Sequence, residues 1–354
     1  MIVADGLPGQ GAGRVARKRL FTFNVVVTGI CNAHCTYCHY YSRRDRKEIE
    51  YHLNPDLFAA YMNFIKHWST VISGETRYRF SGGDPMTMKG KLFEYANTAY
   101  SIVGTKPFVL TAGKALSTSW LESAKQSALS HACISIENPI APDPGAPDPH
   151  KVIDFIRRYN SKEFPLIAGV CVIPPSQFGN LDKIVDWFYD ELGHIPVLHE
   201  VNYDAYVPPT EQQWHALEEA IPKIVTKYLG KTPLILFPSV SPELAFGGDD
   251  AYVFDLDLEN MYSINLSNYK DRIEHVAGRL RNDYPKLSCI RTQCSWWEYC
   301  DNVKWFWNGD RHHSRHEKLR DYCRFKRIMN DAYYRHLVDS EHKTTEYTVL
   351  EVVN

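Results

Sequence analysis

The stretch that decides the fold is LFTFNVVVTGICNAHCTYC, residues 20–38. Its first part, Leu20 to Thr28, is a β-rich apolar run, and we expect a buried strand there. Three cysteines follow on one short loop, Cys31, Cys35 and Cys38, with the spacing C-x3-C-x2-C. A strand that carries three thiols just beyond its end indicates a metal or cluster site at that end.

Strand-like and helix-like segments alternate through most of the chain. We expect strands at 20–28, 78–80, 107–110, 132–137, 166–173 and 197–203, and helices at 54–68, 91–103, 119–129, 152–159, 181–192 and 210–229. This order is typical of βα units around a parallel sheet. Six units are too few for a closed (β/α)8 barrel, so we predict the α/β class with a partial (β/α)6 TIM-like barrel. The loops after the strands should meet at one edge of the sheet, which brings the cysteines close to Gly82, Gly83, Thr111 and Glu137.

The composition argues against a nucleic-acid-binding, membrane-spanning or secreted protein. The chain has 354 residues, 44% of them hydrophobic, and its 40 basic and 42 acidic residues give a net charge of −2. This balance predicts no nucleic-acid or membrane partner, and no apolar run reaches the roughly 18 residues of a membrane helix. The segment Met1 to Gly13 lacks the apolar core of a signal peptide. Nine cysteines without a secretion signal indicate reduced thiols and a cytoplasmic location.

We expect four segments along the chain. They are a flexible leader at 1–19, the barrel at 20–207, a C-terminal extension at 208–340 and a tail at 341–354. The boundary lies at Pro208-Pro209, where the alternating pattern stops. Within the extension we expect a hairpin over 251–266.

Three thiolates on one loop can hold three corners of a cubane [4Fe-4S] cluster. The fourth iron is then open to a small molecule, whereas most iron–sulfur proteins close it with a fourth cysteine. The alternative is a zinc site, with His34 or His39 as the fourth ligand.

The spacing of these cysteines, with Tyr37 before the last one, resembles the signature of the radical S-adenosylmethionine (SAM) superfamily. The resemblance implies that SAM binds the open iron of a [4Fe-4S] cluster. It implies that one electron cleaves SAM to methionine and a 5′-deoxyadenosyl radical, which abstracts a hydrogen atom from the substrate. It further implies an external electron donor similar to flavodoxin or ferredoxin.

Two further segments carry the same resemblance. Ser81-Gly82-Gly83-Asp84-Pro85 resembles the family's GGEP segment, which binds the methionyl amino group of SAM. Asp84 keeps the charge of the commoner Glu with a shorter reach, and glycines let the backbone approach a ligand closely. The alternative is an ordinary turn.

The segment Ile134-Ser135-Ile136-Glu137 resembles the stretch that approaches the SAM ribose. Alternation places Ser135 and Glu137 on one side of the strand, which an ordinary polar face would also explain. The resemblance places Tyr37 near adenine, and its amphipathic ring suits that position. Thr111-Ala112-Gly113 stands where relatives often have Thr-Asn-Gly. Ala112 replaces that Asn, so its side chain cannot make the contact from this loop that an Asn side chain would.

A second cysteine group lies near the C-terminus and consists of Cys289, Cys294, Cys300 and Cys323. Its C-x5-C step with aromatic residues between resembles the SPASM or twitch extensions, which bind auxiliary clusters. Four cysteines suffice for one auxiliary [4Fe-4S] cluster. A structural zinc is the alternative, and Asp301 and the His312-His313 pair are possible other ligands.

Other candidate residues lie on the barrel strands. Glu200, Tyr203 and Asp204 end the sixth strand, and any of them could deprotonate a radical intermediate. Cys133 and Cys171 are most simply buried strand cysteines, although a thiol near the barrel opening could donate a hydrogen atom to a substrate radical.

The resemblance implies a radical SAM oxidoreductase, and we expect a maturase that crosslinks a ribosomally made peptide through a C–C, C–O or thioether bond. Only residues 1–19 precede the first strand, so we expect either a separate leader-peptide recognition protein or direct binding of the peptide. A dehydrogenase or epimerase acting on a sugar or aminocyclitol is the second hypothesis. A zinc-stabilised binding protein without redox chemistry is the third.

Overall fold

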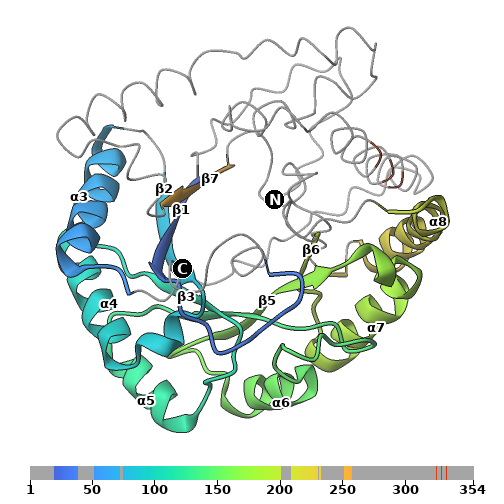
Figure 1. Ribbon diagram of the computed structural model, residues 1–354, viewed down its shortest axis with the longest axis horizontal. Helices are drawn as coiled ribbons and strands as arrows, with labels where there is room; N and C mark the ends of the chain where they lie inside the picture. The colour runs from blue at the N-terminus through green and yellow to red at the C-terminus, as the bar shows by residue number, and fades with distance from the viewer. Residues whose placement is uncertain are drawn as a thin grey trace, which may run out of the picture.

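The computed structural model describes residues 20–38, 52–71, 75–200, 209–229, 231–232 and 251–256, together with Arg324, Ile328 and Ala332. These residues form a curved sheet whose convex side is covered by helices (Figure 1). Within the described ranges, no helix is both long and apolar enough to cross a membrane.

The sheet is parallel throughout and has the order β6-β5-β4-β3-β2-β1-β7. Its strands are β1 (Leu20–Thr28), β2 (Glu75–Gly82), β3 (Phe108–Thr111), β4 (Ala132–Ser135), β5 (Leu166–Ile173), β6 (Val197–Glu200) and β7 (Ala251–Leu256). The two edge strands, β6 and β7, are not paired with each other in the part of the chain that the structure describes. The predicted open (β/α)6 barrel is therefore confirmed.

Strand β7 extends this sheet beyond β1. Leu20 lies opposite Ala251 and Val25 opposite Leu256, in parallel. The sequence predicts a hairpin over 251–266. The structure gives β7 a parallel partner that precedes it by more than 200 residues, and the second half of the predicted hairpin is not among the described residues. Parallel pairing needs a long crossover, and a local turn cannot provide it. Residues 257–266 lie outside the described ranges.

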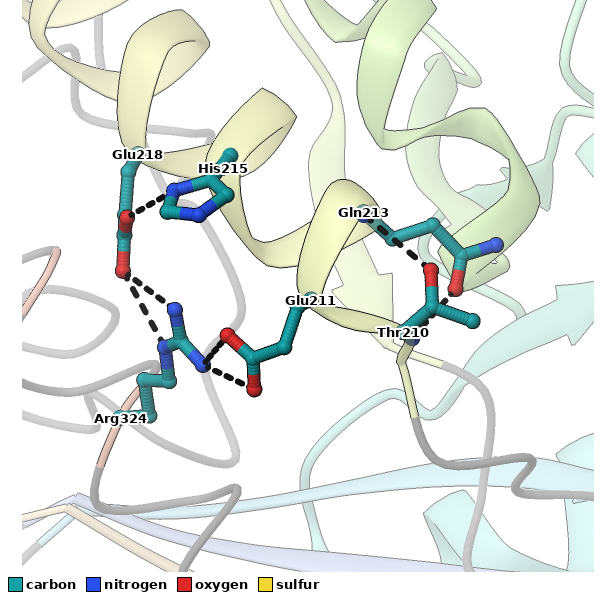
Figure 2. Close-up of polar contacts among 6 residues, drawn as sticks. All are labelled: Thr210, Glu211, Gln213, His215, Glu218 and Arg324. Carbon is teal, nitrogen blue, oxygen red and sulfur yellow. Dashed lines mark hydrogen bonds and ion pairs between the residues drawn. The ribbon is translucent and has the colours of Figure 1, made fainter.

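The predicted helices are confirmed, with ends that differ by a few residues. They are α3 (Pro55–Val71), α4 (Gly90–Val103), α5 (Thr118–Gln126), α6 (Pro149–Tyr159), α7 (Leu181–Leu192) and α8 (Glu211–Tyr228), with short 3-10 turns η1 (Pro85–Met88) and η2 (Pro175–Asn180). Helix α8 begins with a capping box in which the Thr210 side chain accepts from the Gln213 amide and the Gln213 side chain accepts from the Thr210 amide (Figure 2). Such caps satisfy amides that would otherwise lack partners.

Alternation along the strands separates two sides of the sheet. On the helix side, Phe80 of β2 is fully buried and meets the ring of Phe58 from α3 edge-on, with centroids 5.7 Å apart. Full burial of a Phe side chain contributes about 2–3 kcal/mol to folding. On the concave side, Arg79 of β2 donates from Nε to the side-chain oxygen of Asn24 of β1 at 3.1 Å. The fold thus keeps its apolar core between sheet and helices and its polar groups on the concave side.

The C-terminal region returns to helix α8. Arg324 forms ion pairs with Glu211 at 2.8 Å and with Glu218 at 3.0 Å (Figure 2). Its guanidinium also lies over the Trp214 ring, 4.9 Å from the centroid. Ala332 is buried, and Ile328 packs against the same core. These contacts, which we call the Arg324 clamp, hold this part of the chain against the outer side of the barrel.

Candidate functional site

The first four strands end at one edge of the sheet. The loops that follow them there, which we call the mouth, comprise residues 28–38, 81–88, 111–113 and 135–145. The cysteine loop follows β1 directly, as predicted. Cys31, Cys35 and Cys38 are of intermediate exposure, and no disulfide joins them to another described residue. The Cys38 amide donates to the Cys35 carbonyl at 3.1 Å, and the Ala33 amide donates to the Cys31 sulfur at 3.3 Å. The loop therefore has defined turns around all three thiols.

The glycine turn after β2 packs on the backbone that leads into this loop. The Gly83 amide donates to the Thr28 carbonyl at 2.7 Å, and the Asp84 amide donates to the Ile30 carbonyl at 2.8 Å. A Cβ at Gly82, where φ is 125°, would lie 2.0 Å from the Thr28 oxygen, and a Cβ at Gly83 would lie 2.3 Å from the Ile30 oxygen. Both glycines are required because two backbones touch here.

Asp84 is fully buried and joins two of the mouth loops. Its Oδ1 accepts from the Met86 amide at 3.0 Å, which caps η1, and from the Thr111 hydroxyl at 2.8 Å. Burial raises the pKa of Asp84, and the hydrogen bonds from Thr111 and Met86 partly offset that rise. The sequence predicts Asp84 as a SAM ligand; in the structure, Oδ1 has a structural function, and Oδ2 has no partner among the described residues.

Tyr37 and Glu137, both predicted SAM-binding residues, meet at the mouth. The Tyr37 hydroxyl donates to Oε2 of Glu137 at 2.5 Å, and the Asn138 amide donates to Oε1 at 2.9 Å. Burial is the main cause that raises the pKa of Glu137 and of Tyr37. Burial also raises the pKa of the neighbouring Cys35 thiol to about 12. Ser135, the other predicted residue of this segment, is partly exposed at the end of β4.

Unpaired polar atoms gather at the mouth. In the ranges that the structure describes, seven side chains carry a buried nitrogen or oxygen without a hydrogen-bond partner, and four of them belong to Asn32, Ser81, Asp84 and Asn138. Such atoms are rare in folded proteins, and each calls for an explanation. Four at one edge of the sheet indicate a ligand that supplies the missing donors and acceptors.

Three thiols on one loop are the kind of donor that an iron–sulfur cluster takes. Among the described residues, no group of three His, Cys, Asp or Glu side chains is placed to hold a single metal ion. A cubane cluster, however, binds each thiolate at a different iron, so its ligands need not converge on one point. The raised pKa of Cys35 means that iron must displace the thiol proton on binding, as metal ions do at cysteine sites.

Sequence reasoning missed several residues that build the mouth. Thr111 was expected at this edge of the sheet, but its hydrogen bond to Asp84 was not. Asn32 and Asn138 carry unpaired atoms, and Asp143 and Gly145 contact the cysteine loop from the segment after β4. Short polar residues in loops carry no local signal of a distant partner.

Several predicted residues lie outside the described ranges. These are Tyr203 and Asp204, the auxiliary cysteines Cys289, Cys294, Cys300 and Cys323, and the side chain of Glu200, whose backbone ends β6. Cys171 on β5 is fully buried, as predicted for a strand cysteine, and burial raises the pKa of its thiol. Cys133 on β4 is of intermediate exposure, and its sulfur occupies the space that a Cβ at Gly169 would need, 1.9 Å away.

Comparison with known proteins gives a likeness in structure alone. No family model matches the chain, and no curated protein matches it. A structure of native anSMEcpe with bound AdoMet and the Cp18Cys peptide matches with a TM-score of 0.58 at 12% identity, over 91% of this chain and 98% of that chain. A structure of the same protein with AdoMet alone matches with a TM-score of 0.59 at 12% identity, over 91% and 98%. At this identity the likeness shows that the chain has the same open α/β barrel.

Proposed function

We propose that this chain is a radical SAM enzyme, with a [4Fe-4S] cluster on Cys31, Cys35 and Cys38 and SAM bound beside it. The observation that carries the proposal is the mouth, where a C-x3-C-x2-C loop and a glycine turn are joined through their backbones and ringed by unpaired buried polar atoms. The solved structures that share this barrel, at 12% identity, were determined with AdoMet bound, which supports the same ligand here.

When bound, a reduced cluster would supply one electron for cleavage of SAM to methionine and a 5′-deoxyadenosyl radical, which would take a hydrogen atom from the substrate. The protein holds and orients these groups. Gly82 and Gly83 let the turn after β2 pack directly on the backbone that leads into the cysteine loop. We propose that this turn binds the methionyl amine, where Ser81 offers an unpaired hydroxyl. We propose that Glu137, which the Tyr37 hydroxyl orients, accepts hydrogen bonds from the ribose hydroxyls.

For the substrate we propose a ribosomally made peptide, in which the radical forms a C–C, C–O or thioether crosslink. The structural neighbour anSMEcpe was solved with a peptide bound, which supports this class. We further propose one auxiliary [4Fe-4S] cluster on Cys289, Cys294, Cys300 and Cys323 in the C-terminal extension. A flavodoxin- or ferredoxin-like electron donor and a separate leader-peptide recognition protein complete the proposal, which places the enzyme in the cytoplasm.

Anaerobic purification tests this function. We expect brown protein with about eight irons, four for each of two clusters, and 5′-deoxyadenosine when SAM and a reductant are added. Replacement of Cys31, Cys35 and Cys38 by Ala should remove about four irons and abolish SAM cleavage. Cys133→Ala is the matched control, since it removes a thiol outside the cysteine loop, and it should cleave SAM as the wild type does.

Two outcomes would change the proposal. Colourless protein that contains zinc and leaves SAM intact would overturn it in favour of a zinc-stabilised binding protein. SAM cleavage that is stimulated by a sugar or aminocyclitol, and unaffected by peptides, would keep the radical chemistry and overturn the peptide.

A further inference from the structure

The loop between β4 and α6 holds the cysteine loop on both sides of Cys35. The His34 amide donates to the Gly145 carbonyl at 2.9 Å. The Thr36 amide donates to Oδ2 of Asp143 at 2.9 Å, and the Thr36 hydroxyl donates to the same oxygen. The two residues that flank Cys35 are therefore fixed by a segment 107 residues away, Asp143–Gly145, which we call the strap.

The strap is itself shaped to make these contacts. Oδ1 of Asp143 accepts from the Gly145 amide at 2.8 Å, and the Asp143 carbonyl accepts from the Ala146 amide at 3.0 Å. A Cβ at Gly145 would lie 2.0 Å from the His34 carbonyl oxygen. One carboxylate thus closes the strap's own turn with one oxygen and binds the cysteine loop with the other, and only glycine fits at the point of contact.

The other end of the cysteine loop is held differently. Near Cys31, Lys114 donates from Nζ to the Asn32 carbonyl at 2.6 Å, in an exposed position. A lysine ammonium on a flexible stem fixes the position of its partner less strictly than a carboxylate that accepts from a backbone amide. The glycine turn already fixes the backbone just before Cys31 through the Ile30 carbonyl. The strap adds contacts to both residues that flank Cys35.

We propose that Asp143 and Gly145 are positioning residues that hold Cys35 ready for the cluster before any cluster is bound. That Cys35 binds a cluster rests on the proposed function. A ligand loop that is ordered in advance loses less conformational entropy when it binds, so the strap increases the retention of the cluster. The order itself is a property of the cluster-free chain.

The order of the loop is tested first, in the cluster-free full-length protein. In Asp143→Asn one carboxylate oxygen becomes an amide group, so the side chain cannot accept from both Thr36 and Gly145. We expect hydrogen–deuterium exchange in peptides spanning residues 31–38 to become at least tenfold faster. Asp148→Asn is the matched control, because Asp148 lies in the same loop but accepts from the His150 amide, at 3.0 Å, as the cap of α6. Its exchange in 31–38 should equal that of the wild type.

Cluster retention is tested second. After anaerobic reconstitution with iron and sulfide, the iron of the first cluster is removed with an excess of the chelator bathophenanthroline, in chains whose auxiliary cysteines are replaced by Ala. We expect Asp143→Asn and Gly145→Ala to lose iron at least threefold faster than the wild type. Gly179→Ala is the control, because a Cβ there comes no closer than 4.0 Å to any other residue.

A milder variant covers the case in which Asp143→Asn or Gly145→Ala fails to fold. Thr36→Val keeps the backbone bond to Asp143 and removes only the hydroxyl donor, so we expect a smaller acceleration of both rates. If Thr36→Val and every folded strap variant exchange and release iron like their controls, the strap proposal is overturned. If the wild type takes up no iron, the proposed function fails, and the exchange rates of the cluster-free proteins still decide whether the strap orders the loop.

Discussion

The cysteine loop and the Arg324 clamp are both held against distant parts of the barrel, but by different forces. The cysteine loop is bound by amides that donate to a carbonyl and a carboxylate, and by a glycine turn that touches its backbone. The polar part of the Arg324 clamp is two ion pairs, from Arg324 to Glu211 and to Glu218 (Figure 2). The side chains of Arg324, Glu211 and Glu218 are 24%, 75% and 37% exposed.

The two kinds of contact differ in how strictly they fix the positions of the atoms they join. Backbone hydrogen bonds are short and directional, so they fix where the atoms of the loop lie. Exposed ion pairs have modest free energies, depend on salt and tolerate changes in side-chain conformation. The structure uses the first kind around the candidate chemistry and the second kind where the C-terminal region meets α8.

The largest effect is expected at the glycine turn. Gly83→Ala should lower the free energy of unfolding by about 3 kcal/mol or more, because the new Cβ would meet three backbone atoms of Gly29 and Ile30 within 2.6 Å. Urea unfolding monitored by circular dichroism measures this loss. The matched control is Gly90→Ala, where a Cβ has nothing within 4 Å and the change should be neutral or slightly stabilising. Equal stabilities of the two variants would show that the backbones at the mouth do not touch.

A smaller effect is expected at His131. The cation of Arg324 is paired with two carboxylates, whereas a protonated His131 ring would be buried against an aromatic ring. The His131 ring stacks on Phe108 with centroids 4.6 Å apart, and burial, with a smaller contribution from Arg77, lowers its pKa to about 4. The unfolded chain has the ordinary pKa of about 6.5, so it binds more protons between pH 4 and 6.5. Stability should therefore fall as the pH decreases through this window, by roughly 2–3 kcal/mol.

Comparison of variants isolates this histidine. We expect His131→Phe to lose less stability than the wild type between pH 7 and pH 4.5, measured as the free energy of unfolding at each pH. The control His150→Gln, on the exposed start of α6, should retain the wild-type dependence on pH. An identical acid sensitivity of His131→Phe and the wild type would show that His131 does not resist protonation.

The barrel could be predicted from the sequence because its signals are local. Apolar runs such as LIAGVCVI at 166–173 and the amphipathic pattern of 181–192 fix strand and helix by their periods. The parallel order then follows from the alternation of the two, and it places the cysteine loop and the glycine turn at one edge. Pairing between β1 and β7 was not predictable in the same way, since a long crossover leaves no periodic signal.

The candidate site was only partly predictable. The cysteines, Tyr37 and Glu137 were found through spacing and resemblance, but no motif marked the strap. Its partners lie 107 residues away, and short polar loop residues do not reveal a distant contact. Asp84 is the opposite case: an Asp before Pro85 is a local capping signal, so its bond to the Met86 amide could have been predicted.

The smallest effect is expected at the Arg324 clamp, and salt dependence distinguishes it from the strap. Arg324→Gln should lower the free energy of unfolding by about 1 kcal/mol at low ionic strength, because it breaks both ion pairs and the contact with Trp214. The difference from the wild type should shrink when the salt is raised to about 1 M, because the Debye length then falls from about 10 Å at 0.1 M to about 3 Å and exposed charges are screened more strongly. Arg158→Gln is the control, since its pair with Asp154 is 71% and 63% exposed and 3.7 Å long, and its loss should be near zero at either salt concentration. A loss at Arg324 that is large and independent of salt would mean that packing on Trp214, and not charge, joins the C-terminal region to α8, and the contrast with the strap would then be one of geometry alone.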